Sequence, residues 1–216
     1  NRPLVIFLFG GSFVAGSKNS SDIVELCTRY AKMGYVAAAI DYRLTTELIF
    51  LANEQTAYMA ATKGIHDLKG SIRFFRMNND IYNDFNIDVN RIYAGGVSAG
   101  AISVVNAAYL DHVDEIPSFI IDYISDNGGL EGNSGNQEYS SDFNGIINLC
   151  GGVGNTAWIE PDDTPIVSLH GTSDGVVPYG DGLITLFGLN MPIMGSYSIH
   201  NRMMELGNSS SFLSWE

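Results

Sequence analysis

Short apolar runs alternate along the chain with longer amphipathic stretches. Residues 4–9 form an unbroken run of branched and aromatic side chains that ends at Gly10 and Gly11, as expected for a strand that is buried on both faces and then enters a turn. Similar runs predict strands over residues 35–40, 91–95, 146–150, 165–170 and 212–216.

Apolar residues at helical spacing occupy the segments between these runs. Ser21 precedes such a pattern, which stops at Gly34. Residues 53–77, 99–110 and 195–207 predict three further helices. Strands and helices that alternate in this way predict an α/β fold with a mostly parallel sheet and helices on both faces.

Three segments interrupt the alternation. Residues 78–90 are rich in Asn and Asp but lack the Gly that a calcium-binding loop needs at its sharp turn, so we interpret them as a solvated loop. Residues 125–144 have almost no apolar content and predict a surface excursion. Residues 180–194 are apolar without a period and predict a loop over the sheet edge or over a pocket. Because the sequence shows neither an internal repeat nor a linker, residues 1–216 are expected to form one domain.

The charge balance excludes several classes of partner. The chain has 11 Lys and Arg residues against 24 Asp and Glu residues, a net charge of −13, and such an acidic surface repels nucleic acid and anionic lipid headgroups. No apolar run reaches the roughly 18 residues that span a bilayer, so we expect no membrane span. Cys27 and Cys150 allow at most one disulfide and are interpreted as buried thiols.

The pentapeptide Gly96-Val97-Ser98-Ala99-Gly100 is the clearest candidate for chemistry. It has the pattern G-x-S-x-G, follows a predicted strand and opens a predicted helix, which is the setting of a nucleophile elbow. The tight turn holds the serine above the carboxyl edge of the sheet at a helix N-terminus, where an anion is stabilised. We therefore predict that Ser98 is a catalytic nucleophile. A Gly-rich turn whose serine only caps the helix is the alternative.

A serine nucleophile also needs hydrogen-bond donors for the developing oxyanion. Residues 9–13 follow the first predicted strand and contain Gly10 and Gly11, so side chains obstruct their backbone amides little. We predict an oxyanion hole made by the amides of Gly11, Ser12 and Ala99. A plain Gly-Gly turn is the alternative.

An acidic residue suited to a catalytic triad follows the predicted strand 165–170. Asp174 lies in the loop beyond the carboxyl end of that strand, where ligands bind in open α/β sheets. There it can accept the Nδ1 hydrogen bond of a catalytic imidazole and stabilise the imidazolium. Glu160, Asp162 and Asp163 precede the strand, so we expect them at the opposite edge of the sheet as solvated charges.

Together these motifs resemble the α/β-hydrolase superfamily, and within it the carboxylesterase-like esterases and lipases with an HGGG-type oxyanion loop. The resemblance covers essentially the whole chain. Residues 9–13 look like that loop, with Phe9 where His is usual and Ser12 in place of the third Gly. Ser98 and Asp174 follow the family's chain order of Ser, Asp and His.

The resemblance implies a serine carboxylic-ester hydrolase that acts on a small-molecule ester through an acyl-enzyme and needs neither a metal ion nor a cofactor. Acetyl or feruloyl esters on polysaccharide are alternative substrates. A serine peptidase of the same fold and a catalytically silent hydrolase-fold binding module are alternative functions.

The histidine is the missing member of this predicted triad. The chain has four histidines. His66 and His112 stand in the wrong part of the family's order, and the resemblance makes His170, in the family's His-Gly-x-x-Asp turn, a structural residue. His200 lies within the predicted helix 195–207, on the order of 7 Å below its first turn.

In the resembling family the base follows one further strand, and residues 212–216 look like that strand. We therefore expect the base beyond Glu216, with His200 as the alternative. The chain also begins at once with a strand that two others precede in the family, so the sequence is expected to be an excerpt of the domain, incomplete at both ends. The sequence leaves the oligomeric state open, and also whether the protein is secreted or periplasmic.

Overall fold

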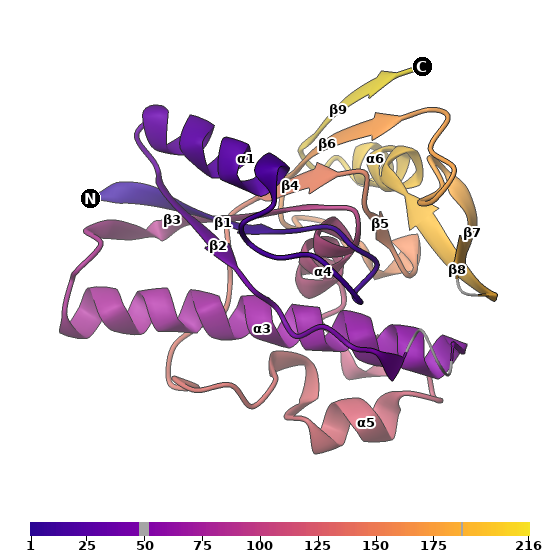
Figure 1. The fold of residues 1–216 in the computed structure, drawn as a ribbon, viewed down its shortest axis with the longest axis horizontal. Helices are drawn as coiled ribbons and strands as arrows, with labels where there is room; N and C mark the ends of the chain where they lie inside the picture. The colour runs from indigo at the N-terminus through magenta and orange to yellow at the C-terminus, as the bar shows by residue number, and fades with distance from the viewer. Residues whose placement is uncertain (48–51, 187) are drawn as a thin grey trace.

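The computed structural model describes residues 1–47, 52–186 and 188–216, and its central feature is a six-stranded sheet (Figure 1). In spatial order the strands are β2 (Val36–Ile40), β1 (Arg2–Leu8), β3 (Ile87–Val97), β4 (Ile146–Leu149), β6 (Ile166–Gly171) and β9 (Ser210–Trp215). Each neighbouring pair runs parallel. The predicted strands are present, and the prediction of an α/β fold with a parallel sheet is confirmed.

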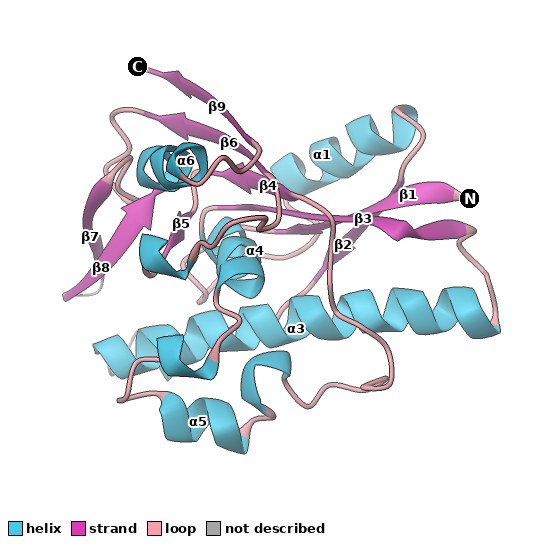
Figure 2. Cartoon of the chain, turned by 180° about the vertical axis from the view of Figure 1, so that it is seen from behind, coloured by secondary structure: helices cyan, strands magenta, loops and turns pink. Residues whose placement is uncertain are grey.

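Helices cover both faces of this sheet. α1 (Ser21–Lys32) lies on one face, where the ring of its Tyr30 packs 5.3 Å from the ring of Phe7 in β1. α3 (Glu54–Ile81), α4 (Ala99–Tyr109) and α6 (Ser196–Glu205) lie on the opposite face, which Figure 2 shows. The shorter elements are α5 (Ile121–Asp126), η1 (Val113–Glu115), η2 (Gly129–Glu131) and η3 (Thr156–Trp158).

The core forms around β1 because its side chains are apolar without a break. Residues 4–8 are all 0% exposed, on both faces of the strand, as a central parallel strand requires. On the far side of α4, α3 approaches closely, since a Cβ on Gly64 would lie 2.3 Å from Ser103 Oγ. Within the described ranges, no helix has the length and apolar character needed to cross a membrane.

Residues 180–194, which the sequence pattern predicts as a loop, form a β-hairpin instead. β7 (Asp181–Leu186) pairs antiparallel with β8 (Leu189–Gly195), and β5 (Gly152–Val153) adds a short third strand beside β8. The alternation of buried and exposed residues is obscured in the sequence because Leu183 faces solvent, 53% exposed, and Pro192 stands opposite it in the ladder. The hairpin does lie over a pocket, as predicted.

The predicted loop 78–90 is shorter than the sequence suggests. α3 continues to Ile81 and β3 begins at Ile87, which is 1% exposed. The side chain of the buried Asn78 donates to the Asp84 carboxylate and accepts the Asp84 amide. The Asn and Asp residues that suggested a solvated loop therefore close the turn between helix and strand.

Two buried cations of α3 bind the polar segment 125–144, so the prediction of a surface excursion describes this segment only in part. Arg73, 2% exposed, donates to three backbone carbonyls of the segment, and Lys69 lies 2.6 Å from the Glu131 carboxylate. Burial raises the pKa of Glu131, but hydrogen bonds from Lys69 and Ser141 and the two positive charges outweigh it and hold that pKa below its usual value. The segment is thus held to α3 by hydrogen bonds and charges.

Replacing Glu131 by Gln should destabilise the fold, because the buried Lys69 and Arg73 lose their anionic partner. The Glu131 side chain is itself 58% exposed, so solvent screening keeps the effect below that of a fully buried pair. We expect a loss of about 1–2 kcal/mol in the free energy of unfolding, measured by urea denaturation at neutral pH. Because the folded pKa of Glu131 is lowered, this difference is present above the unfolded pKa and should vanish as the pH falls through the folded value.

The exposed pair between Glu25 and Arg29 supplies the control. Glu25→Gln should change the free energy of unfolding by less than about 0.5 kcal/mol. Equal effects of the two substitutions would show that burial of the cations does not matter.

Candidate active site

Ser98 stands in a sharp turn between β3 and α4. Its backbone has φ 52° and ψ −118°, and such a positive φ costs a residue other than glycine of order 1–3 kcal/mol. Hydrogen bonds hold the turn from both sides: the Ser98 amide donates to Leu149 O over 2.9 Å, and Ser98 O accepts the amide of Ile102 in the first turn of α4. The local structure is therefore the strand, tight turn and helix that the pentapeptide predicts.

The glycines of this turn are required by close contact. A Cβ on Gly100 would lie 2.3 Å from Leu8 O, and one on Gly96 would lie 2.3 Å from the carbonyl carbon of Gly100. Gly10 is also restricted, since its Cβ would lie 3.1 Å from Val97 O. The end of β1, the loop after it and the turn after β3 therefore meet at the serine.

The loop after β1 curls toward the same point. Gly11, Ser12 and Phe13 have φ values of 134°, 55° and 64° in succession. Within the described residues, no hydrogen bond uses the Gly11 or Ser12 amide, and Ala99 is the first residue of α4, where amides have no partner inside the helix. Ser12 and Ala99 line one cavity together with Ser98. Two of the three predicted oxyanion donors thus border the cavity of the serine, and Gly11 adjoins them.

An aromatic partner braces Phe9, which stands where the resembling family has a histidine. The Phe9 ring stacks on Tyr42 with centroids 4.3 Å apart, and the Tyr42 hydroxyl donates to Phe9 O over 2.9 Å. Burial raises the pKa of Tyr42, so its hydroxyl stays protonated as a donor. Sequence reasoning missed this support, whose only signal was an aromatic residue just after the second strand.

Asp174 lies in the turn after β6, and the backbone of that turn holds its carboxylate. Oδ1 accepts the amides of Val176 over 2.8 Å and Val177 over 3.1 Å, and Oδ2 lies 3.3 Å from His170 Nε2. β3 and β6 are separated in the sheet by β4 alone. The structure therefore places Asp174 at the same carboxyl edge as Ser98.

Both cysteines are free thiols, and one of them lies at this edge. Cys150 follows β4. Burial raises the pKa of its thiol, the Ser98 amide lowers it, and the negative charge of Asp174 raises it again. Cys150 thus lies within electrostatic reach of both predicted catalytic residues.

No hydrogen bond joins Ser98 to any of the four histidines, all of which are among the described residues. His66 is buried and bonds through Nε2 to a backbone carbonyl over 2.8 Å, while His112 is exposed beside two carboxylates. His200 bonds through Nδ1 to Ser210 Oγ over 2.8 Å. His200 is thus engaged with β9, and the structure does not bring it to Ser98.

His170 belongs to a buried polar network below the sheet edge. The residue is 0% exposed, its Nδ1 lies 2.8 Å from Ser196 Oγ, and its Nε2 donates to Val177 O over 3.1 Å. Asn148 donates to the hydroxyls of both Ser168 and Ser196. Sequence reasoning missed this network, although polar residues inside the two otherwise apolar strands β4 and β6 were a signal.

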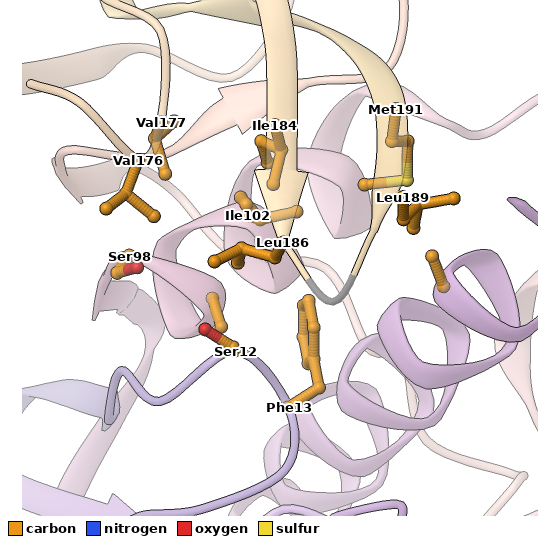
Figure 3. A pocket seen from close by; sticks show the side chains of 12 residues that line it. Ser12, Phe13, Ser98, Ile102, Val176, Val177, Ile184, Leu186, Leu189 and Met191 are labelled. Carbon is orange, nitrogen blue, oxygen red and sulfur yellow. The ribbon is translucent and has the colours of Figure 1, made fainter. Parts of the chain in front are cut away.

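A cavity with mostly apolar walls opens at Ser98 (Figure 3). Ser12 and the turn of Ser98 form one end, and the β7–β8 hairpin forms the wall that faces α4. The apolar lining includes Phe13, Ile102, Val176, Val177, Ile184, Leu186, Leu189 and Met191. The site therefore combines a serine, unused backbone amides and room for an apolar group.

The chain matches known proteins in sequence and in fold. The BD-FAE family profile matches residues 1–153. Gut esterase 1 of Caenorhabditis elegans is 30% identical over 102 residues, which make up 47% of this chain and 17% of that protein. This chain therefore spans only a small part of that curated relative.

Solved structures of an esterase from Thermogutta terrifontis show the same fold. Esterase 2 phosphorylated by paraoxon matches with a TM-score of 0.69 and 21% identity, over 100% of this chain and 71% of that one. The propionate-bound form matches with a TM-score of 0.69 and 21% identity, over 100% and 72%. The sheet and its helices are therefore those of an α/β-hydrolase.

Gly100→Ala should destabilise the protein, because the new Cβ would meet a backbone carbonyl of the central strand at 2.3 Å. We expect a loss of about 2–3 kcal/mol, measured as a lower urea midpoint at unchanged m-value. Gly175→Ala is the matched control, since an added Cβ there meets nothing within 4 Å. If both variants unfold at the same urea concentration, the close contact is not a constraint.

Proposed function

The chain belongs to the BD-FAE family of hydrolase-fold esterases, and we propose that it is a serine carboxylic-ester hydrolase with Ser98 as its nucleophile. The placement of Ser98 carries this proposal: the residue has a positive φ at the N-terminus of α4 and opens on a mostly apolar cavity. A serine that only capped the helix would bond to it, yet within the described chain the Ser98 side chain makes no cap hydrogen bond.

In the proposed reaction, Ser98 Oγ attacks the carbonyl carbon of the ester while a base takes its proton. The carbonyl oxygen becomes an oxyanion, to which the amides of Gly11, Ser12 and Ala99 donate. The C–O bond to the alcohol then breaks, and the alcohol leaves with the proton from the base. Water activated by the same base hydrolyses the acyl-enzyme and releases the acid.

Fixed dipoles favour this reaction in the proposed site. The Ala99 amide belongs to the first turn of α4, where the helix carries partial positive charge. The Ser12 amide belongs to a loop whose successive positive φ values hold its shape. Donors that are held before the reaction starts need little reorganisation when the negative charge develops.

We propose that Asp174 orients the base. Its Oδ1 already binds two backbone amides, so the carboxylate has a defined orientation. His170 is an unsuitable base because it is fully buried and both its ring nitrogens are engaged, and His200 is engaged with Ser210. We therefore propose neither His170 nor His200 as the base that acts on Ser98.

The walls of the cavity support a small acyl ester as the substrate. The hairpin and α4 present aliphatic side chains to the space beside Ser98. One solved Thermogutta structure is bound to propionate, a short acyl group, and another is phosphorylated by paraoxon. By analogy, short p-nitrophenyl esters and organophosphorus probes are suitable test compounds for this protein.

Ser98→Ala in the full-length protein should lower kcat for a short p-nitrophenyl ester by several orders of magnitude. Without the triad, residual catalysis over water is only about 10³–10⁴-fold. A fluorophosphonate probe should label the wild type and spare the variant. Ser118→Ala, at an exposed serine, should change neither readout. Activity of Ser98→Ala within tenfold of the wild type would refute the proposal, and absence of both hydrolysis and labelling in the wild type would indicate a binding module.

His200→Ala tests the assignment of the base. Because His200 is bonded to Ser210, the full-length variant should keep kcat within about tenfold, whereas loss of a triad base costs about 10⁴ or more. Circular dichroism and thermal unfolding should show that the variant is folded. A collapse of kcat in a folded variant would make His200 the base.

A further inference from the structure

A second apolar cavity lies behind the one that opens at Ser98. The two cavities share the side chains of Phe13, Ala57, Ile102 and Met191. In Figure 3, Met191 lies at the end of the first cavity that is remote from Ser98. The space between atoms is about 510 Å³ in the first cavity and about 560 Å³ in the second, and both figures include open solvent at the mouth. The cavities therefore follow one another from Ser98, with one shared wall between them.

The buried polar side chains that border the second cavity, Asn106 and Thr62, are already used within the protein. Asn106 donates from Nδ2 to two backbone carbonyls and accepts the Gly154 amide at Oδ1. Thr62 donates to a carbonyl of the preceding helical turn. The hydrogen-bond donors of both side chains are thus occupied, whereas an alkyl chain needs no partner.

We propose that the two cavities form a single acyl channel and that the preferred substrates are esters of medium-chain aliphatic acids. This inference rests on the proposed function, because it takes Ser98 as the point to which the acyl group is attached. The alcohol receives its proton from the base that Asp174 orients, so it leaves on the Asp174 side. Asp174 borders a different cavity from Ser98. The acyl chain takes the other direction, toward Met191.

Met191 controls passage between the two cavities. Phe13 is 6% exposed in a backbone conformation with φ 64°, and Ile102 is 6% exposed on α4, so both are held in place. Met191 is half-buried on β8 and has an unbranched side chain that adapts to the shape of its surroundings. It is the residue of the shared wall that can move aside for a chain.

The expected specificity follows from the burial of methylene groups. Each buried CH₂ contributes about 0.8 kcal/mol, or roughly fourfold. The kcat/KM for p-nitrophenyl esters should therefore keep rising from butyrate to decanoate, as the chain passes Met191 into the second cavity.

Trp158 offers a readout of this channel that does not depend on catalysis. It lines the second cavity, whereas Trp215, the other tryptophan of the chain, borders the cavity of Asp174. In a Trp215→Phe background, ω-bromodecanoate should quench Trp158 emission because its heavy atom reaches the second cavity. Saturating ω-bromobutyrate should leave the emission unchanged.

Variants at the shared wall test the path of the chain. Met191→Phe should abolish quenching by ω-bromodecanoate and lower kcat/KM for the decanoate ester at least tenfold relative to the butyrate ester. Leu183→Phe is the matched control, because Leu183 lies on the same hairpin but is 53% exposed. Ala57→Leu adds bulk to the wall from α3 and gives the same test if Met191→Phe does not fold.

The other outcomes of the quenching experiment decide whether the acyl channel exists and whether the protein hydrolyses esters. Absence of quenching in the unblocked protein, or quenching that survives both blocking variants, overturns the channel. Quenching by ω-bromodecanol but not by the acid overturns its assignment to the acyl side. Quenching without hydrolysis of any ester supports the channel and refutes the proposed function instead.

Discussion

The contact between the Gly100 backbone and the Leu8 carbonyl determines where the rest of the site can lie. It brings the first turn of α4 directly over the carboxyl end of β1, the most deeply buried strand. The tight turn between β3 and α4 lies beside this contact, and in it Ser98 takes a positive φ. The strain persists because the buried core around β1 and the hydrogen bonds of the turn outweigh it.

Behind this contact, a polar network connects the sheet to the turn that carries Asp174. Asn148 and Ser168 extend from neighbouring strands toward Ser196 at the start of α6, and His170 continues the chain of hydrogen bonds to the Val177 carbonyl. Fully satisfied polar groups in a dry interior rigidify their surroundings. The position of the Asp174 carboxylate therefore depends on buried residues of β4, β6 and α6.

The sequence predicts those parts of the molecule that rest on local pattern. Residues 4–9 are predicted as a buried strand because no polar residue interrupts them. The pentapeptide around Ser98 is recognisable in the sequence because close backbone contacts require its glycines. Contacts between residues that are far apart in the sequence leave no such local pattern. Nothing local to Arg73 reveals that a segment some sixty residues later will bury it, and the stacking of Phe9 on Tyr42 appears only when β1 and β2 are paired.

The hairpin was missed for a related reason. Its inward-facing residues alternate as a strand requires, but Leu183 points to solvent and Pro192 interrupts the pattern of strand-forming side chains. Only their position on the face that borders the cavity and the core distinguishes the buried side chains from the exposed ones. Tertiary packing, which a single sequence does not display, decides this element.

The hairpin and the frame of β1, β3 and α4 are two parts of the protein that can change independently during evolution. The hairpin belongs to its own three-stranded sheet, in which β8 pairs with the two residues of β5, yet it supplies a large part of the wall beside Ser98. Substitutions along β7 and β8 can remodel that wall without disturbing the frame of β1, β3 and α4 that holds the serine. Relatives that keep this frame can therefore differ in the shape and polarity of the cavity beside the serine.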